Sequence, residues 1–164
     1  KSKIRFIGAS LALIKKAEHL TEHFDNQIIN INNNLRALST RPRILTLLSL
    51  GGSAPIAAGS DTAVNTVITL AHGQNCFSNL SGYKPVSAES IIAAAPDFLL
   101  LPLHVVKSGG GVEAITKKPY LRDTPAGRNK RVVVMDSLKL LGLGLRTPEA
   151  ILELSQEIHA LNTI

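Results

Sequence analysis

The sequence has few of the residues on which several classes of protein depend. Its 164 residues include a single cysteine, Cys76, and no tryptophan, and aromatic residues make up only 4% of the chain. One cysteine excludes an internal disulfide framework and a cysteine-based zinc site. The scarcity of aromatics argues against a stacking platform for single-stranded nucleic acid. No apolar run reaches about 18 residues, so no membrane-spanning helix is predicted.

The residues that are present are those of a folded globular protein. Hydrophobic residues make up 45% of the chain, which excludes an intrinsically disordered polypeptide. A chain of this length suits one compact domain and would bury roughly 70% of its unfolded surface.

Acidic residues are outnumbered by basic ones, and the net charge is +6. Residues 104–146 hold nine bases and three acids, so this stretch carries the whole excess. Clustered positive charge attracts phosphates, anionic membranes or carboxylate ligands. For most of these bases, which flank turns, solubility is the favoured explanation, and nucleic-acid binding is not predicted. Arg146 is set apart, because it stands between glycines and the start of a helix.

The first segment has the pattern of one unusually long helix. Residues 3–38 contain no proline and a single glycine, Gly8, and apolar residues recur at steps of three or four. A straight helix of this length would extend roughly 50 Å, which exceeds the diameter of a small domain. We therefore expect residues 1–40 to form a long helix that links two bodies.

This segment also carries a short metal-binding pattern. His19, Glu22 and His23 match the His-x-x-Glu-His arrangement of inverted zinc peptidases. The chemistry would need a third ligand and a cleft beside the helix. Both histidines are expected on the solvent side of the apolar stripe. A zinc-dependent hydrolase is therefore the less favoured alternative, and no metal site is predicted.

Beyond Pro42, strand-like and helix-like segments alternate. Strands are predicted at residues 44–50, 75–77, 98–101 and 131–135. Helices are predicted at 61–72, 88–95, before Lys117 and at 148–161, with Ser60, Ser87 and Thr147 as N-caps. The alternation predicts an α/β fold with a Rossmann-like, mostly parallel sheet covered on both faces.

In such sheets, ligands bind at the loops that follow the carboxyl ends of the strands. Here these loops are residues 51–59, 104–111 and 136–146, and they supply the candidate ligand-binding residues Ser53, His104, Lys107 and Arg146. The glycines of the first two loops match neither the dinucleotide-binding nor the Walker pattern. A nucleotide-dependent enzyme is therefore not predicted.

Six short segments, in order, resemble the C-terminal lobe of the periplasmic hemin-binding proteins that feed ABC importers. They are AAGSDTA at 57–63, ITLAHGQN at 68–75, GYKPVSAE at 82–89, AAPD at 94–97, TPAG at 124–127 and LGLGLRTP at 141–148. The resemblance implies that residues 41–164 form the C-terminal α/β lobe and that residues 1–40 form the helix joining two lobes. The N-terminal lobe of the family has no counterpart in the sequence.

The resemblance also implies a function and its residues. The chain is expected to bind heme as a transported ligand, without a catalytic cofactor, and to deliver it to an ABC permease from the periplasm. Family members usually bind the iron through a tyrosine of the other lobe. Arg146 would stand near that tyrosinate or the heme propionates, and Tyr83 is a further candidate on the cleft wall. Glu89 matches a glutamate that contacts the permease, although it is also a residue favoured by the dipole of its helix.

Two consequences and one alternative complete the prediction. The protein is expected to be a binding protein and not an enzyme. An isolated lobe would expose surfaces that normally face its partner, so we expect self-association or weak heme binding by this chain alone. An iron-siderophore or cobalamin receptor shares the lobe architecture and is the alternative within binding proteins.

Overall fold

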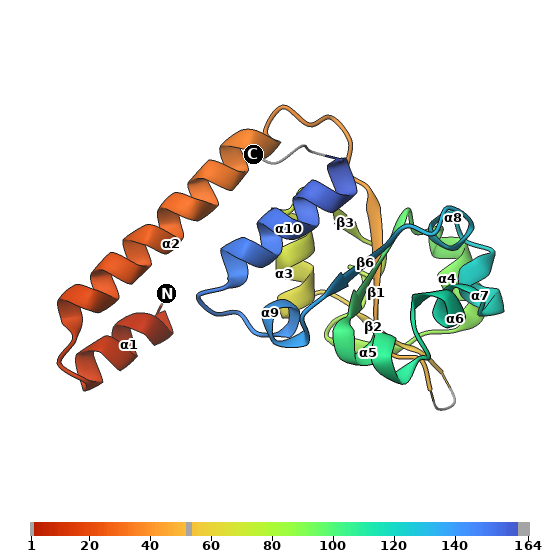
Figure 1. Cartoon of the computed structure of the whole chain (residues 1–164), viewed down its shortest axis with the longest axis horizontal. Coiled ribbons are helices and arrows are strands. Elements are labelled where there is room, and N and C mark those ends of the chain that lie inside the picture. The colour runs from red at the N-terminus through yellow and green to blue at the C-terminus, as the bar shows by residue number, and fades with distance from the viewer. Residues whose placement is uncertain (1, 52–53, 161–164) are drawn as a thin grey trace. The chain divides into compact units, whose positions relative to one another are not determined.

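The structure is a computed structural model that describes residues 2–51 and 54–160 (Figure 1). The chain divides into two compact units, Lys1–Ala37 and Leu38–Ile164. Within the described residues, no helix is both long enough and apolar enough to cross a bilayer.

The first unit is a pair of helices, α1 (Ser2–Ser10) and α2 (Ile14–Leu35), so the prediction of one continuous helix over residues 3–38 is wrong. The chain turns at Ala12, whose φ of 54° is left-handed. The amides of Ala12 and Leu13 donate to the carbonyls of Ala9 (3.2 Å) and Gly8 (2.7 Å). These two bonds form a Schellman motif, which ends α1. The break escaped prediction because alanine, not glycine, occupies the left-handed position and the apolar spacing continues through it.

Gly8 allows the two helices to approach closely. A Cβ atom at this position would lie 2.3 Å from the Cβ atom of Ala17, a separation that real side chains do not adopt. Ala17, Thr21, Ile31 and Leu35 form the buried side of α2. The glycine that looked incidental in one long helix is thus the contact point of a helical hairpin.

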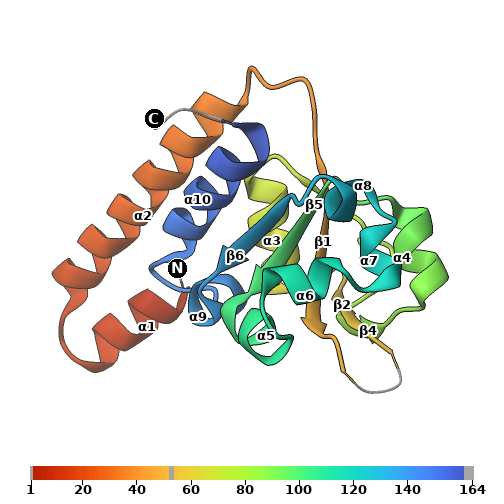
Figure 2. The same ribbon diagram turned by 45° about the vertical axis from the view of Figure 1, so that its right-hand side comes forward.

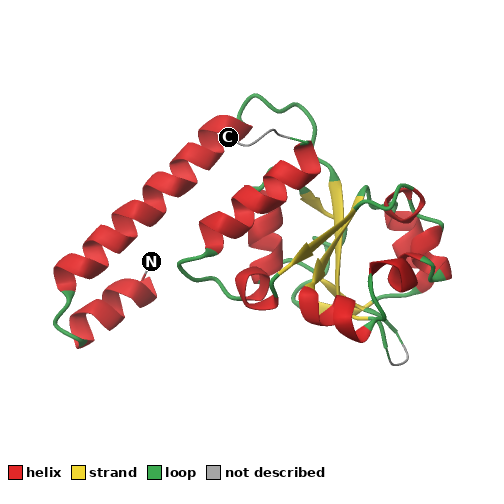
Figure 3. Cartoon of the chain, in the orientation of Figure 1, coloured by secondary structure: helices red, strands yellow, loops and turns green. Residues whose placement is uncertain are grey.

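The second unit is built on a mixed sheet in the order β4-β2-β1-β5-β6, with β3 also paired to β1. Its strands are β1 (Arg43–Ser49), β2 (Ile56–Ala58), β3 (Gln74–Asn75), β4 (Tyr83–Pro85), β5 (Phe98–Pro102) and β6 (Val132–Met135). Strands β3, β5 and β6 belong to the parallel part around β1, whereas β2 runs antiparallel to both β1 and β4. The mostly parallel α/β fold is therefore confirmed, and Figure 3 shows the sheet between its helices.

Helices cover both faces of this sheet (Figures 1 and 2). One face carries α3 (Ala63–Leu70), α9 (Ser137–Leu141) and α10 (Thr147–His159), and the other carries α4 (Ala88–Ala94), α5 (Leu103–Ser108), α6 (Val112–Thr116), α7 (Pro119–Arg122) and α8 (Pro125–Arg128). Alternate residues of β1 and β5 point to opposite faces. Leu45, Leu47, Leu99 and Leu101 consequently pack on one side with Ile91.

Several local predictions need correction. Residues 104–111 are not simply a loop, because α5 begins directly after β5. The short strands β2 and β4 were not predicted. Thr62, not Ser60, caps α3, and its hydroxyl accepts from the amide of Asn65 at 3.1 Å. Thr147 begins α10, and its hydroxyl accepts from the amide of Gly144. The predicted cap at Ser87 is confirmed.

We predict that Gly8→Leu opens the helical hairpin, because its side chain would overlap Ala17. Overpacking of this kind costs about 1–3 kcal/mol. Hydrogen exchange of the α1 amides should become much faster in this variant. Ala9→Leu is the matched control, since Ala9 is exposed on the same helix. Equal protection of α1 in both variants would refute the role of Gly8.

Candidate functional site

The candidate site lies where the carboxyl ends of three parallel strands meet. Strands β1, β5 and β6 run in one direction, so the segments that follow them leave the sheet at one edge. These segments are residues 50, 51, 54 and 55, helix α5, and helix α9 with the loop of residues 142–146. We call this edge the carboxyl edge. Ser53 lies outside the described residues.

His104 and Ser137 meet at the carboxyl edge because of the strand register. Pro102 pairs with Met135, and His104 and Ser137 each lie two residues further along the chain. The Ser137 hydroxyl lies 2.8 Å from Nδ1 of His104 and accepts from the backbone amide of His104 at 3.2 Å. Ser137 therefore holds both the ring and the backbone of His104, one contact each, while the residue remains exposed.

Arg146 lies at the same edge, at the end of the loop that precedes α10. Its Nη2 atom is 3.4 Å from Oδ1 of Asp136, and both side chains are about half exposed, at 51% and 49%. The same carboxylate oxygen accepts from the amide of Lys139 at 2.9 Å and so caps α9. An exposed ion pair of this kind contributes at most about 1 kcal/mol. An anionic ligand can therefore replace the carboxylate as the partner of the guanidinium.

Leucine side chains are exposed on the same segments as these polar groups. Leu138 is 75% exposed, and Leu103, Leu143 and Leu145 are 38%, 53% and 49% exposed. Exposed apolar side chains gathered beside a few directed polar groups are typical of a ligand-binding surface. The carboxyl edge therefore suits a ligand that is largely apolar and carries negative charge.

Of the other two predicted ligand-binding residues that the structure describes, Lys107 lies on a segment of the carboxyl edge and Tyr83 does not. Lys107 follows His104 by one turn of α5 and is exposed. Tyr83 pairs with Ala58 at the start of the edge strand β4, whereas Pro85, at its end, pairs with Ile56 near Ser49. Tyr83 therefore lies away from the carboxyl edge. Partial burial raises the pKa of its phenol.

Glu89 is in the first turn of α4, which begins just after β4. The amide of Val86 donates to the carbonyl of Pro55 at 2.9 Å, which ties this segment to the one that follows β1. The carboxylate is fully exposed, and hydrogen bonds from its own backbone amide and from the Ser87 hydroxyl lower its pKa. A negative charge is therefore held at the same end of the lobe as the candidate site.

Most of the excess positive charge is elsewhere on the surface. Lys117 pairs with Glu113 at 3.3 Å, and Arg122 pairs with Asp123 at 2.9 Å. The Arg131 guanidinium lies 5.5 Å from the ring centroid of Phe98. These contacts give three of the bases local partners away from the carboxyl edge.

The zinc-peptidase pattern lies on the exposed side of α2, in the first unit. Among the described residues, no three histidine, cysteine, aspartate or glutamate side chains are grouped so as to hold a metal ion. His19, Glu22 and His23 therefore have no third ligand beside them in that part of the chain.

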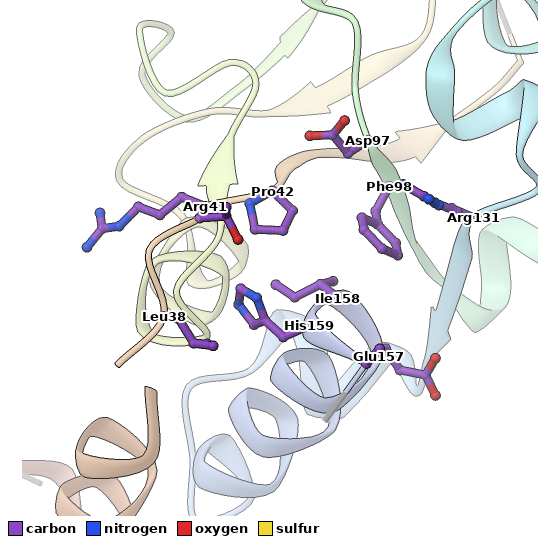
Figure 4. Close-up of a pocket in the computed structure, with 11 residues that line it drawn as sticks. Leu38, Arg41, Pro42, Asp97, Phe98, Arg131, Glu157, Ile158 and His159 are labelled. Carbon is purple, nitrogen blue, oxygen red and sulfur yellow. The ribbon is translucent and has the colours of Figure 1, made fainter. Parts of the chain in front are cut away.

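A separate cavity of about 610 Å³ lies at the opposite end of the sheet (Figure 4). The Nε2 atoms of His72 and His159 lie 3.0 and 3.2 Å from the carbonyls of Leu38 and Ala71. Burial, together with the neighbouring His72, lowers the pKa of His159. In Figure 4 the carboxylate of Glu157 points away from the space beside His159. None of the predicted ligand-binding residues that the structure describes lines this cavity.

Sequence reasoning missed three contributors to the carboxyl edge: Asp136, Ser137 and Leu138. A signal was present, because an acidic and a hydroxyl residue directly follow the predicted strand at 131–135. Their significance depends on the pairing of β5 with β6, which the sequence pattern does not specify.

Known proteins with the same fold match most of the residues of this chain. The family profile described as "Periplasmic binding protein" matches residues 1–138. The periplasmic heme-binding protein RhuT from Roseiflexus sp. RS-1, in its apo form, is 35% identical, with a TM-score of 0.91, and the match covers 97% of this chain. The periplasmic heme-binding protein BhuT, solved with two hemes, is 31% identical, with a TM-score of 0.90 and the same coverage of this chain.

A curated relative supports the same assignment. The uncharacterized ABC transporter substrate-binding lipoprotein YvrC from Bacillus subtilis (strain 168) is 22% identical over 157 residues, which are 95% of this chain. The chain spans 48% of YvrC and 61% of each of the two structures.

The fold and the matching profile are those of a periplasmic binding protein. The chain belongs to the periplasmic binding protein family, and the resemblance found in the sequence is confirmed.

Proposed function

We propose that the chain is one lobe of a periplasmic protein that binds heme and delivers it to the permease of an ABC importer. The observation that carries the proposal is the carboxyl edge, where exposed leucines lie on the same segments as Arg146 and His104. A porphyrin ring is flat and apolar, and its propionates are anionic, so this surface complements both parts of the ligand. The heme-binding relatives add independent support.

Residues 41–164 would form the C-terminal lobe, and residues 1–40 would connect it to a second lobe. The first unit supports this organisation, because large apolar side chains of α1 and of the following turn are exposed. The exposed fractions are 74% for Phe6, 55% for Ile7, 63% for Leu11 and 48% for Leu13. A surface of this kind is expected where another part of a protein packs. Lys107, exposed on α5, would complete the proposed wall of the ligand cleft, whereas Tyr83 lies away from it.

We predict that the 164-residue chain alone self-associates through this surface. Sedimentation equilibrium should reveal oligomers that Phe6→Asp weakens, because a charge is costly in an apolar contact. Asn33→Asp adds the same charge at an exposed polar position of α2 and should have no effect. A wild-type chain that stays monomeric would contradict the prediction.

Arg146 should contribute directly to heme affinity. We expect Arg146→Ala to weaken hemin binding about tenfold or more, since a hydrogen bond to a charged group contributes about 1.5–3 kcal/mol. A titration followed at the Soret band measures the effect. Arg128→Ala removes the same charge on α8 and should bind hemin normally. Unchanged affinity in Arg146→Ala would remove Arg146 from the site.

The same titration tests the ligand class. Hemin should compete effectively against a ferric siderophore and cobalamin. Tighter binding of either competitor would reject heme in favour of that ligand.

Glu89 should act in delivery and not in ligand binding. We expect Glu89→Ala, in the two-lobed protein, to reduce heme uptake through the cognate permease while hemin affinity stays unchanged. Glu113→Ala removes an exposed glutamate on α6 and serves as the control. Normal uptake by the Glu89 variant would refute the docking role.

A further inference from the structure

We propose that Nε2 of His104 binds the heme iron from the side of this lobe, and that Ser137 orients the imidazole for this purpose. The inference rests on the proposed function, and it adds an iron ligand where the family resemblance supplied one only from the other lobe. It begins with the two contacts of Ser137, at 2.8 Å to Nδ1 and 3.2 Å to the backbone amide of His104.

The contact with Ser137 occupies Nδ1, which leaves Nε2 as the ring nitrogen open to the iron. A serine hydroxyl oxygen has two acceptor lone pairs, so it can accept from the His104 amide and from a protonated Nδ1 together. Nε2 then keeps its lone pair, and no described residue makes a hydrogen bond to it. In metal sites, the hydrogen bond at one ring nitrogen fixes the tautomer and orients the other nitrogen toward the metal.

Other side chains with suitable chemistry are placed elsewhere. The Nε2 atoms of His72 and His159 are hydrogen-bonded to backbone carbonyls, beside the cavity at the opposite end of the sheet. Cys76 cannot serve as a thiolate, because burial raises its pKa to about 12. Met135 is only 1% exposed. Tyr83 lies toward the start of β4, away from the carboxyl edge. Among the residues that the structure describes, His104 is thus the exposed iron-binding side chain at this edge.

The residues around His104 suit a porphyrin that is bound through its iron. Leu103 precedes His104, and Leu138 follows Ser137, so an exposed leucine adjoins each member of the hydrogen-bonded pair. Lys107 on α5 and Arg146 on the loop before α10 provide positive charges for the propionates. Iron, ring and propionates would each meet a group of matching chemistry.

The test compares ferric hemin with metal-free protoporphyrin IX, using the 164-residue chain. Wild type should bind hemin more tightly than the metal-free ring and show the absorption and electron paramagnetic resonance spectra of nitrogen-ligated ferric heme. His104→Ala should bind the metal-free ring as wild type does but lose both the preference for hemin and the nitrogen-ligand spectrum. Added imidazole should restore the spectrum. Unchanged binding of the metal-free ring shows that the variant is folded.

Two variants complete the design. Ser137→Ala should keep the ligand but weaken the preference for hemin about tenfold, as loss of an orienting partner does at metal sites. His19→Ala, on the exposed side of α2, should change nothing. Equal binding of both rings by wild type, or an unaltered hemin spectrum in His104→Ala, would overturn the ligand assignment alone. Failure of wild type to bind either ring would overturn the proposed function and the ligand assignment together.

Discussion

The parallel pairing of β1, β5 and β6 determines the position of every side chain in the candidate site. Parallel strands end at the same edge, and the helices that return the chain begin there. The Pro102–Met135 pair sets the register between β5 and β6, and it places His104 opposite Ser137.

The parallel part of the fold could be predicted because its pattern is strong. Long apolar runs at residues 44–50, 98–101 and 131–135 correspond to buried strands, and the Ser87 hydroxyl caps a helix as expected. The short strands β2 and β4 could not be predicted in this way. Each has only three residues, and all three residues of β4 are exposed. Pairing with neighbours, and not an apolar pattern of their own, makes them strands.

The helix break at Ala12 and the partners of His104 and Arg146 escaped prediction for related reasons. Apolar spacing reports which face of a segment is buried, but it does not report where the backbone turns. The spacing therefore continues through Ala12, although hydrogen bonds to Ala9 and Gly8 end the helix there. Similarly, His104 and Arg146 were identified from their positions after strands, while their partners Ser137 and Asp136 emerge only from the pairing of the strands and the folding of the loop.

The Asp136 carboxylate provides a counter-charge for Arg146 at the carboxyl edge. Its Oδ1 atom caps α9 and also faces Arg146. If an anionic group draws the guanidinium away, the cap on α9 persists and the helix keeps its first turn. When that group departs, the guanidinium has a counter-charge to return to. Binding and release would then exchange one weak ionic contact for another, without unfolding any backbone, which would suit the proposed role in delivering a ligand.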